Sequence, residues 1–405
     1  MSCNKIVKFG DVCSEVKITT KDPIADGYER YIGLEHLDSG SLKIQRWGII
    51  AEDNPSFTRV FKKDQILFGK RRPYLKKCAI AEFDGVCSGD ILVLDIKNKI
   101  IPRDIFYYLV KSDKVWKEAI RSSSGSLSPR TKFKSLKDIE FRIPSKNEMI
   151  NSQGFIKKAK EIIAHSRCFS QDVKFSAKAT IRCLLRYGII QNRELTNYGS
   201  LGSIPSHWNW KKLDDLAKEN EPAIRTGPFG SALKADHWCA EGRPVITIGC
   251  LGEYGYDASE ELYIDESYAE KLSSYSVKSG DIVFSRVADI GRSILVGEDL
   301  CAAIISSNLM KISLDEVKVD PRFYFYSIKY SPIVLHQVKR FTNSGGRLLV
   351  TSRDLRKIKF PTPPYDEQIK IADFIERLLI ITEKIESSVE RQESIVSGYV
   401  SRIFY

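Results

Sequence analysis

The most regular pattern in the chain is an apolar repeat near the C-terminus, with spacings of three and four residues. Such a repeat is typical of a helix that pairs along one face. A weaker repeat with smaller residues lies near the middle of the chain. The C-terminal repeat consists of Ile371, Ile375, Leu378, Thr382, Ile385, Val389, Gln392, Val396, Tyr399 and Ile403, and the central one of Phe155, Ala159, Ile162, Ser166, Phe169, Val173, Ser176, Thr180, Cys183 and Tyr187. The sequence therefore predicts two long helices whose seams can pair.

Before the central repeat, short β-branched and aromatic runs alternate with turns, a pattern that favours strands. Strands are predicted at Gln65–Phe68, Cys78–Ala81 and Asp90–Leu94. A helix is predicted after Pro102, with Ile105, Leu109, Trp116 and Ile120 on one side. A Gly/Ser-rich loop at 122–126 and a last strand ending at Pro144 follow. This order indicates a mixed α/β domain.

The same order of elements occurs a second time further along the chain. Four blocks of the first copy resemble four later blocks, in the same order and at offsets between 216 and 219. Block 62–68 matches 278–284, block 88–94 matches 306–312, block 106–108 matches 323–325, and block 136–141 matches 355–360. The helix of the second copy follows Pro321 and is expected to be interrupted at Pro332, and its Gly/Ser-rich loop lies at 343–346. A nearly constant offset over four blocks indicates a duplicated domain rather than a short repeat.

The charges of the two long stretches favour their pairing. Residues 146–190 contain nine basic and three acidic side chains, whereas residues 361–405 contain five basic and eight acidic ones. Opposite charge beside two seams favours one partner over self-association. The alternatives are that each helix packs only on its own domain, or that it forms a homodimer.

The predicted fold is therefore α/β (α+β), with two tandem-duplicated globular domains separated by two long antiparallel helices that form an intramolecular coiled coil. The predicted boundaries are 1–145 for the first globular domain, 146–200 for the central helix and linker, 201–363 for the second globular domain and 364–405 for the C-terminal helix.

Composition narrows the class of protein. The 405 residues carry a net charge of +11, and 42% of them are apolar, which excludes a wholly disordered chain. The sequence shows no apolar run near the roughly 20 residues of a membrane span and no secretory signal, so a cytoplasmic protein is expected. The nine cysteines and five histidines are scattered, which gives no metal-ligand spacing and favours reduced thiols.

Several short motifs resemble one family. The motifs are Thr226-Gly227-Pro228-Phe229-Gly230-Ser231, Ile204-Pro205-Ser206-His207-Trp208, Pro361-Thr362-Pro363-Pro364-Tyr365-Asp366-Glu367-Gln368 and Lys278–Phe284. All four are similar to motifs of the specificity subunits of type I restriction-modification systems. The resemblance covers essentially the whole chain. The first copy departs from it, because Pro144-Ser145-Lys146-Asn147-Glu148 lacks the second proline and the glutamine, and a shorter or less regular central helix is expected there.

The resemblance implies a non-catalytic subunit without a cofactor or metal of its own. In this family, two target recognition domains each read one half of a split sequence in double-stranded DNA, and the helices set the spacer. Two modification (methyltransferase) subunits bind S-adenosylmethionine and dock on the helices, and restriction/translocase subunits add ATP- and Mg-dependent translocation and cleavage. No membrane is involved.

Basic loops are the candidate DNA contacts, because arginine and lysine bind phosphates and arginine also reads guanine. In the first copy the candidates are Lys70, Arg71, Arg72, Tyr74 and Lys76 after a predicted strand, and Arg121, Ser124 and Arg130 at the Gly/Ser-rich loop. In the second copy they are Arg286, Asp289 and Arg292, with Arg347 at the loop, and the family resemblance adds Arg225, Thr226, Phe229 and Ser231. Phosphate contact alone, or a solvated charged turn, is the alternative for the two loops that follow strands, and a purely structural turn is the alternative for the Gly/Ser-rich loops.

Catalytic motifs are weak in comparison. Thr362-Pro363-Pro364-Tyr365 resembles the Asn/Asp-Pro-Pro-Tyr motif of adenine-N6 methyltransferases, but threonine lacks the carbonyl or carboxylate oxygen that the motif needs. Asp84 with Asp95 and Lys97 loosely fits a nuclease pattern, and Gly227–Gly230 lacks the Gly-Lys-Ser/Thr ending of a nucleotide loop. A self-sufficient DNA-modifying enzyme or nuclease, and a protein-interaction scaffold, remain as alternatives.

Overall fold

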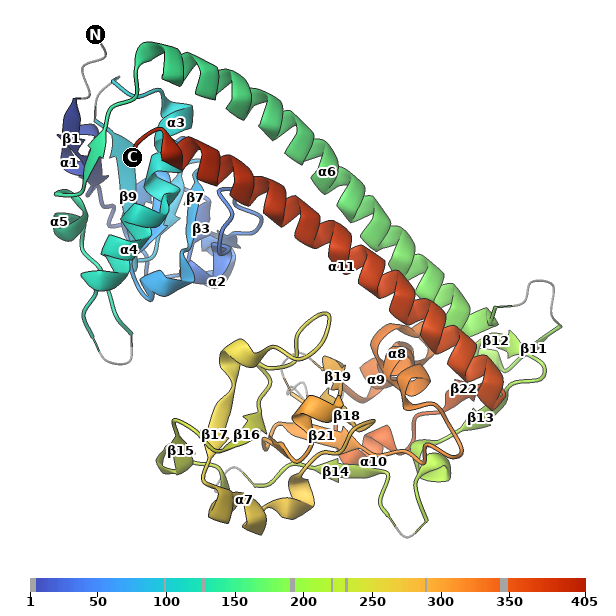
Figure 1. The fold of residues 1–405 in the computed structure, drawn as a ribbon. Coiled ribbons are helices and arrows are strands. Elements are labelled where there is room, and N and C mark those ends of the chain that lie inside the picture. The colour runs from blue at the N-terminus through green and yellow to red at the C-terminus, as the bar shows by residue number, and fades with distance from the viewer. Residues whose placement is uncertain are drawn as a thin grey trace. The chain divides into compact units, whose positions relative to one another are not determined.

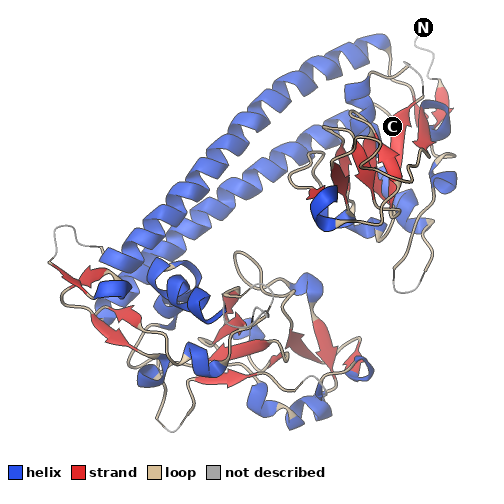
Figure 2. Ribbon diagram, turned by 180° about the vertical axis from the view of Figure 1, so that it is seen from behind, coloured by secondary structure: helices blue, strands red, loops and turns tan. Residues whose placement is uncertain are grey.

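The computed structural model describes residues 5–97, 100–125, 128–189, 194–219, 221–229, 232–287, 290–342 and 349–405. The chain forms two compact units, one comprising residues 1–168 with 387–405 and the other residues 169–386. Each unit contains one mixed α/β domain and part of each long helix (Figure 1, Figure 2). The chain therefore passes from one unit to the other twice, each time within a helix.

The domain of the first unit contains two four-stranded sheets and one two-stranded sheet. The four-stranded sheets have the orders β2-β9-β6-β7 and β4-β3-β8-β5, and β1 pairs antiparallel with β10. The strands are β1 (Ile6–Lys8), β2 (Cys13–Val16), β3 (Arg30–Ile32), β4 (Gly48–Ile49), β5 (Arg59–Phe61), β6 (Ile66–Gly69), β7 (Cys78–Ile80), β8 (Gly85–Cys87), β9 (Ile91–Ile96) and β10 (Glu140–Arg142). Strands β6, β7 and β9 confirm the three predicted ones to within two residues at each end.

The helices of the first domain are short. They are α1 (Phe9–Val12), α2 (Ile50–Asp53), α3 (Arg103–Lys111), α4 (Asp113–Arg121) and α5 (Phe133–Leu136). The single helix predicted after Pro102 is wrong, because Ser112 takes an extended conformation and divides it into α3 and α4. Trp116 is buried and stacks on Phe68 with ring centroids 4.1 Å apart, whereas Ile120 is exposed.

The domain of the second unit repeats this topology except at the edges of one sheet, because β5 pairs with β8 in the first domain whereas β15 pairs with β17, the counterpart of β4, in the second. Its four-stranded sheets have the orders β14-β21-β18-β19 and β15-β17-β16-β20, and β13 pairs antiparallel with β22, as β1 does with β10. The strands are β11 (Leu195–Asn197), β12 (Ser203–Pro205), β13 (Asn209–Lys211), β14 (Ile224–Thr226), β15 (Trp238–Cys239), β16 (Arg243–Ile246), β17 (Leu262–Ile264), β18 (Ile282–Ser285), β19 (Ser293–Leu295), β20 (Ile304–Ile305), β21 (Leu309–Ile312) and β22 (Phe360–Thr362). β11 pairs with β12 outside these sheets.

The helices described in the second domain correspond to α2–α5 of the first. They are α7 (Glu266–Lys271), α8 (Pro321–Tyr330), α9 (Pro332–Thr342) and α10 (Ser352–Leu355). Helix α8 ends before Pro332, as predicted, and Ser331 lies at the break just as Ser112 does in the first domain. The common break shows that the duplication extends to details that the aligned blocks did not reveal.

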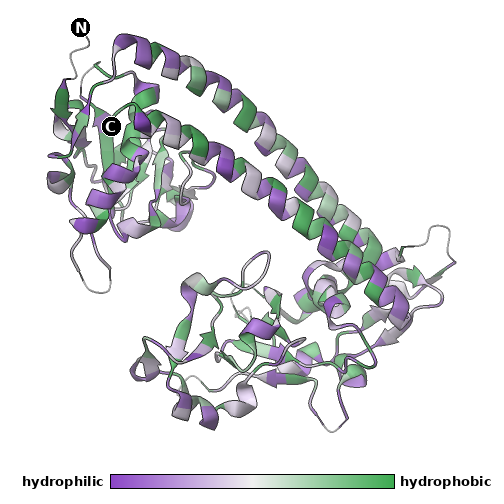
Figure 3. Cartoon of the chain, in the orientation of Figure 1, coloured by the Kyte–Doolittle hydropathy of each residue, from purple (hydrophilic) through white to green (hydrophobic). Residues whose placement is uncertain are grey.

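The two long helices are α6 (Lys146–Tyr187) and α11 (Tyr365–Arg402). With 42 residues, α6 is longer than the 38-residue α11, so the expectation of a shorter central helix is wrong. The helices run antiparallel within each unit: Phe155 contacts Tyr399 in the first, and Lys174 binds Glu386 in the second. Green and purple alternate along both helices in Figure 3, as the apolar repeat requires.

The predicted seam of α11 agrees with the buried positions over most of its length. Ile371, Ile375, Thr382, Val389 and Val396 are all buried. The predicted seam of α6 is displaced, because none of its ten residues is among the buried side chains of this helix, which are Ser152, Ile156, Ser170, Ala177, Ile181 and Leu185. Four of these six side chains lie one residue after a predicted seam position.

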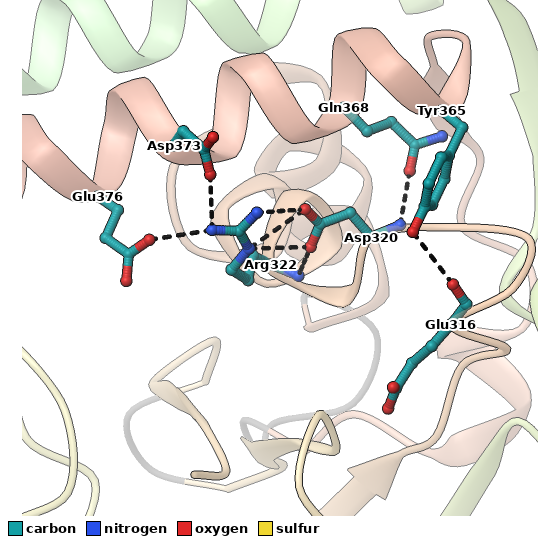
Figure 4. Close-up of polar contacts among 7 residues, drawn as sticks. All are labelled: Glu316, Asp320, Arg322, Tyr365, Gln368, Asp373 and Glu376. Carbon is teal, nitrogen blue, oxygen red and sulfur yellow. Dashed lines mark hydrogen bonds and ion pairs between the residues drawn. The ribbon is translucent and has the colours of Figure 1, made fainter.

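An ionic network fastens α8 to α11 in the second unit (Figure 4). The Arg322 guanidinium lies 2.7 Å from Asp320, 2.8 Å from Asp373 and 3.0 Å from Glu376. Asp320 caps α8 by accepting the Arg322 backbone N–H, and its own N–H donates to the Gln368 side chain. Since Asp373, Glu376 and Gln368 all belong to α11, this network fixes the helix against the domain.

The end of α11 closes the core of the first unit. Phe404 is fully buried against Phe141, with ring centroids 5.7 Å apart. The Arg142 backbone N–H donates to the Phe404 carbonyl, and its guanidinium donates to the Ile403 carbonyl. The last residues of the chain are thus part of a domain that begins near its first residues. None of the helices in the described ranges is long and apolar enough to cross a membrane.

Candidate nucleic-acid interface

The basic loop of the first domain begins where β6 ends. Arg72 and Lys76 both have left-handed backbone conformations, with φ of 50° and 48°, and these turn the chain sharply around Pro73–Leu75. Lys76 lies 3.0 Å from Asp113 at the start of α4, and the Tyr74 side chain is 53% exposed. The turn therefore presents an aromatic ring and several cations to solvent.

Asp90 joins this loop to the loop that follows α4. Its carboxylate accepts from the Arg130 Nε at 2.7 Å and lies 3.5 Å from the Arg71 Nη1. The hydrogen bond from Arg130 and the nearby charges of Arg71 and Lys70 lower the pKa of Asp90, so it stays ionised at neutral pH. Arg71 also donates to the Ser128 hydroxyl at 3.1 Å. The carboxylate thus holds two arginines from distant parts of the sequence side by side.

Backbone hydrogen bonds fix the same meeting point. The Lys70 N–H donates to the Asp90 carbonyl at 2.9 Å, and the Thr131 N–H donates to the Lys70 carbonyl at 2.9 Å. Ser124 and Arg130 exchange backbone hydrogen bonds of 2.9 and 3.1 Å. The structure therefore brings together four predicted site residues, Lys70, Arg71, Ser124 and Arg130. Arg121 lies at the end of α4, where it pairs with Glu118 at 2.7 Å.

The second domain has the same backbone framework with different side chains. The Arg286 N–H donates to the Asn308 carbonyl at 3.2 Å, and the Val350 N–H donates to the Arg286 carbonyl at 2.9 Å. Val287 and Leu349 form a bridge, as Arg71 and Arg130 do in the first domain. Positions 287, 308 and 349 therefore correspond to 71, 90 and 130, at the offsets of 216, 218 and 219 seen in the sequence blocks.

Several other predicted site residues of the second domain lie apart from this framework or outside the described ranges. The Arg292 Nε donates to the Leu251 carbonyl, which directs its guanidinium toward a neighbouring loop of the same domain. Arg286 is half-buried, and its Nε has no hydrogen-bond partner among the described residues. Asp289, Arg347 and Ser231 lie outside the described residues.

The motif around β14 combines a structural glycine with an exposed aromatic ring. A Cβ atom on Gly227 would lie 2.1 Å from the Ser306 carbonyl oxygen, so only glycine fits there. Arg225 and Thr226 are half-buried at the end of β14, where they pair with β21. Phe229 is 86% exposed, which makes it one of the most accessible large apolar side chains in the described part of the chain.

The weak catalytic motifs have structural explanations. Thr362 is buried in β22, where its hydroxyl accepts from Tyr324 at 3.1 Å and donates to the Phe360 carbonyl at 3.2 Å. Asp84 binds Lys62 at 2.9 Å, and its pKa is lowered by the Lys63 backbone N–H and by Lys62. Asp95 pairs instead with Gln65 and Arg103.

Two features of the site were not predicted. The sequence pattern indicates only a strand at Asp90, although its carboxylate binds both arginines. The sequence gives no signal for Ser128, which binds Arg71. The repeat of Ser88-Gly89-Asp90 as Ser306-Ser307-Asn308 contained a signal for Asp90, because the polar third position sits directly before a buried strand in both copies.

Comparison with known proteins agrees with this duplicated arrangement. The family model described as the type I restriction modification DNA specificity domain matches residues 1–164 and 205–391. The MjaVIII type I restriction enzyme specificity subunit of Methanocaldococcus jannaschii is 22% identical over 96% of this chain and 89% of its own length. The EcoDI specificity subunit of Escherichia coli is 24% identical over 53% of this chain and 45% of its own length.

A solved chain from a study of the assembly and conformational transition of a type I restriction-modification system shares the fold. It is 16% identical and has a TM-score of 0.50 over 98% of this chain and 96% of that chain.

The chain belongs to the type I restriction-modification DNA specificity family. It is a specificity subunit with two tandem target recognition domains, the recognition component of such a system rather than its catalytic one.

Proposed function

We propose that each of the two domains reads one half of a bipartite sequence in double-stranded DNA. The observation that carries this proposal is the backbone framework that both domains share, in which the loop after β6 or β18 meets the loop before α5 or α10. A shared framework with different side chains suits two related domains that recognise different sequences. The basic residues at the first site, Lys70, Arg71, Arg72 and Arg130, supply attraction for phosphates.

The two long helices serve, in this proposal, as a spacer and as a dock for two methyltransferase subunits. Large apolar side chains on α6 support the docking role: Ile162 is 59% exposed, Phe169 60% and Phe175 77%. Clusters of exposed apolar residues commonly mark protein–protein contacts. The methyltransferase subunits would bind S-adenosylmethionine, and restriction subunits would bind ATP and Mg. The assembly would act in the cytoplasm, where the chromosome lies.

DNA binding tests the proposal directly. The chain, in complex with its methyltransferase subunits, is titrated with duplex DNA at several salt concentrations. The logarithm of the affinity is expected to fall with the logarithm of the salt concentration, with a slope of several units. Replacing both Arg71 and Arg130 with alanine should reduce this slope. A flat salt response of the unaltered protein would contradict the proposal.

Lys62 provides a matched control for the loss of charge. It precedes β6, whereas Lys70 and Arg71 follow that strand, and its side chain is 48% exposed. Lys62→Ala removes one cation from the same domain away from the proposed interface, so its salt slope should equal that of the unaltered protein.

A further inference from the structure

The two domains differ most informatively at three corresponding positions. We call Arg71, Asp90 and Arg130 the first triplet, and Val287, Asn308 and Leu349 the second triplet. In each triplet the first and third residues form an antiparallel backbone bridge. The carbonyl of the second residue accepts a hydrogen bond from a backbone N–H in the loop after β6 in the first domain, or after β18 in the second. The triplets are therefore the same piece of structure carrying different chemistry.

The first triplet is charged and tightly organised. The Asp90 carboxylate lies 2.7 Å from the Arg130 Nε and 3.5 Å from the Arg71 Nη1. Both guanidinium groups stay accessible, with 40% of the Arg71 side chain and 46% of the Arg130 side chain exposed. Arginine has five N–H donors, so each guanidinium retains donors after binding Asp90. The carboxylate reduces the freedom of both arginines without covering them.

The second triplet is uncharged. Val287 and Leu349 are half-buried, and Asn308 is exposed. No arginine occupies the positions that correspond to 71 and 130. The only side-chain hydrogen-bonding group of this triplet is the Asn308 amide, which has one acceptor and two donors.

Base pairs in the major groove present groups that match these two sets. Guanine offers O6 and N7 as acceptors for arginine. Adenine offers N7 and N6 for the bidentate amide of asparagine, and the thymine methyl group prefers an apolar side chain. The first triplet thus matches a G·C pair, and the second matches an A·T pair.

We propose that the triplets are specificity-determining, so that the first domain reads at least one G·C pair and the second an A·T pair at the corresponding step. This inference rests on the proposed function, in which each domain reads one half of the target. Within the first triplet Asp90 is a positioning residue, because it acts by holding Arg71 and Arg130.

The test maps methylated sites across the genome in cells that express the complete complex. The variant R71V/D90N/R130L gives the first domain the side chains of the second triplet. It should change or relax one or two base pairs in one half-sequence only, and those pairs should be G·C in the unaltered target. Discrimination at each of them should fall on the order of 10-fold to 100-fold. The other half-sequence should be unchanged.

The single substitution Asp90→Asn tests whether Asp90 acts by positioning the two arginines rather than by stabilising the fold. The amide keeps an acceptor for Arg130 but loses the charge that holds both arginines. Relaxed reading at the G·C pair, with the salt slope of DNA binding retained, is expected. Arg46→Leu is the matched control, because Arg46 is an exposed arginine of the same domain that pairs with Asp38 outside the triplet and is not a predicted DNA contact. Its methylated sequence should be that of the unaltered protein.

The outcomes distinguish this inference from the proposed function. A triplet variant that binds DNA and methylates the original bipartite sequence would overturn the inference and leave the proposed function intact. An altered pair that is A·T in the unaltered target would also overturn it. Failure of the unaltered complex to bind DNA or to methylate a bipartite sequence would instead overturn the proposed function.

Discussion

At the scale of single residues, one glutamate stabilises the start of each long helix, with different partners in the two copies. Glu148 accepts from the Ser145 N–H at 2.7 Å, and the Glu148 N–H donates to the Ser145 hydroxyl at 3.3 Å, which is a capping box. Glu148 also binds Arg142 at 2.9 Å. The corresponding Glu367 accepts instead from His207 at 2.9 Å and from Trp208 at 3.3 Å.

The Glu148 contacts predict a pH-dependent contribution to stability. The hydrogen bond from Arg142, followed by those from Ser145, lowers the pKa of Glu148 to about 2. A lowered pKa means that the contribution is complete above the unfolded value of about 4.3 and is lost as the pH falls toward 2. Because the side chain is partly exposed, Glu148→Gln should cost only about 0.5–1 kcal/mol of unfolding free energy at pH 7.

Urea unfolding at pH 7 and pH 3 measures this difference. The gap between Glu148→Gln and the unaltered protein should shrink at the lower pH. Glu161→Gln, at an exposed position of the same helix, serves as the control and should show little change at either pH. A gap that stayed constant or grew with acid would show that the charge of Glu148 is not what stabilises the helix start.

The residue scale is also where the sequence was least informative about the site. Basic residues after a strand were visible in the sequence, and the structure brings Arg71 and Arg130 together as an interface would need. Which carboxylate they share could not be predicted, because Asp90 lies 19 and 40 residues away from them and only the sheet brings the three side chains close. Pairing over such distances depends on tertiary contacts that local patterns do not encode.

At the scale of elements, the duplicated domains are attached to the long helices by different forces. In the second unit Arg322 bridges α8 to Asp373 and Glu376 of α11 (Figure 4). The corresponding Arg103 of the first domain pairs with Asp95 at 3.6 Å, within its own domain. The first unit instead combines apolar packing of Phe404 and its neighbours with the hydrogen bonds from Arg142 to the Phe404 and Ile403 carbonyls.

The Arg322 network therefore predicts a stability difference between two matched variants. Arg322→Met should destabilise the second unit by about 2–3 kcal/mol, because it leaves the nearly buried Asp320 carboxylate without its partner. Arg103→Met should cost less than about 1 kcal/mol, since its ion pair is longer and more exposed. Chemical unfolding measures the loss of stability in each variant, and hydrogen exchange shows in which unit that loss occurs.

A second substitution tests the reason for this loss. Asp320→Asn in the Arg322→Met background removes the stranded charge, so it should recover part of the stability. If the double variant were less stable than Arg322→Met alone, the cost would come from lost packing of the arginine rather than from the unpaired carboxylate.

The elements show where apolar patterns succeed and where they mislead. Strands β6, β7 and β9 were predicted closely because their buried residues form continuous apolar runs. The seam of α6 was displaced because small residues, Ser170 and Ala177, occupy buried positions, while large apolar ones, Ile162 and Phe169, are exposed. Hydrophobic periodicity reports which face is apolar, and in α6 part of that face, at Ile162 and Phe169, is exposed to solvent.

At the scale of the whole molecule, the exposed aromatic side chains of α6 predict a separable partner contact. Replacing Phe169 and Phe175 with serine should weaken binding of the methyltransferase subunits by about tenfold or more, because exposed aromatic residues are frequent hot spots. The salt slope of DNA binding by the chain alone should be unchanged. Titration calorimetry with the methyltransferase subunit measures the first effect.

Val317 is a suitable control for this contact. It is 90% exposed but lies in the second domain rather than on a long helix. Val317→Ser should leave subunit binding unaltered. Equal weakening by both variants, or none by the double phenylalanine variant, would contradict a dock on α6.

The continuity of α6 and α11 through both units predicts that they set the spacer between the two half-sequences. Ion pairs fix the register of the helices in each unit, Arg167 with Glu393 in the first and Lys174 with Glu386 in the second. Seven residues separate these pairs along each helix, so insertions between 167 and 174 and between 386 and 393 leave both pairs matched.

Four residues inserted at both places should lengthen the spacer by one or two base pairs while both half-sequences stay the same. At about 1.5 Å per residue they add about 6 Å, which corresponds to roughly two base pairs at about 3.4 Å each. Rotation also favours an insertion of four residues. The insertion turns the helices by about 40°, which is close to the rotation of about 70° that two base pairs produce in DNA in the same sense.

A seven-residue insertion in both helices is the matched comparison, because it keeps the heptad repeat. It adds almost no rotation of the seam, whereas the DNA of the corresponding length, about three base pairs, turns by roughly 100°. It should support methylation less well than the four-residue insertion. Genome-wide mapping of methylated sites reads out both variants. An unchanged spacer in an active four-residue variant would show that the distance between half-sequences is set by the domains or their linkers rather than by the helices.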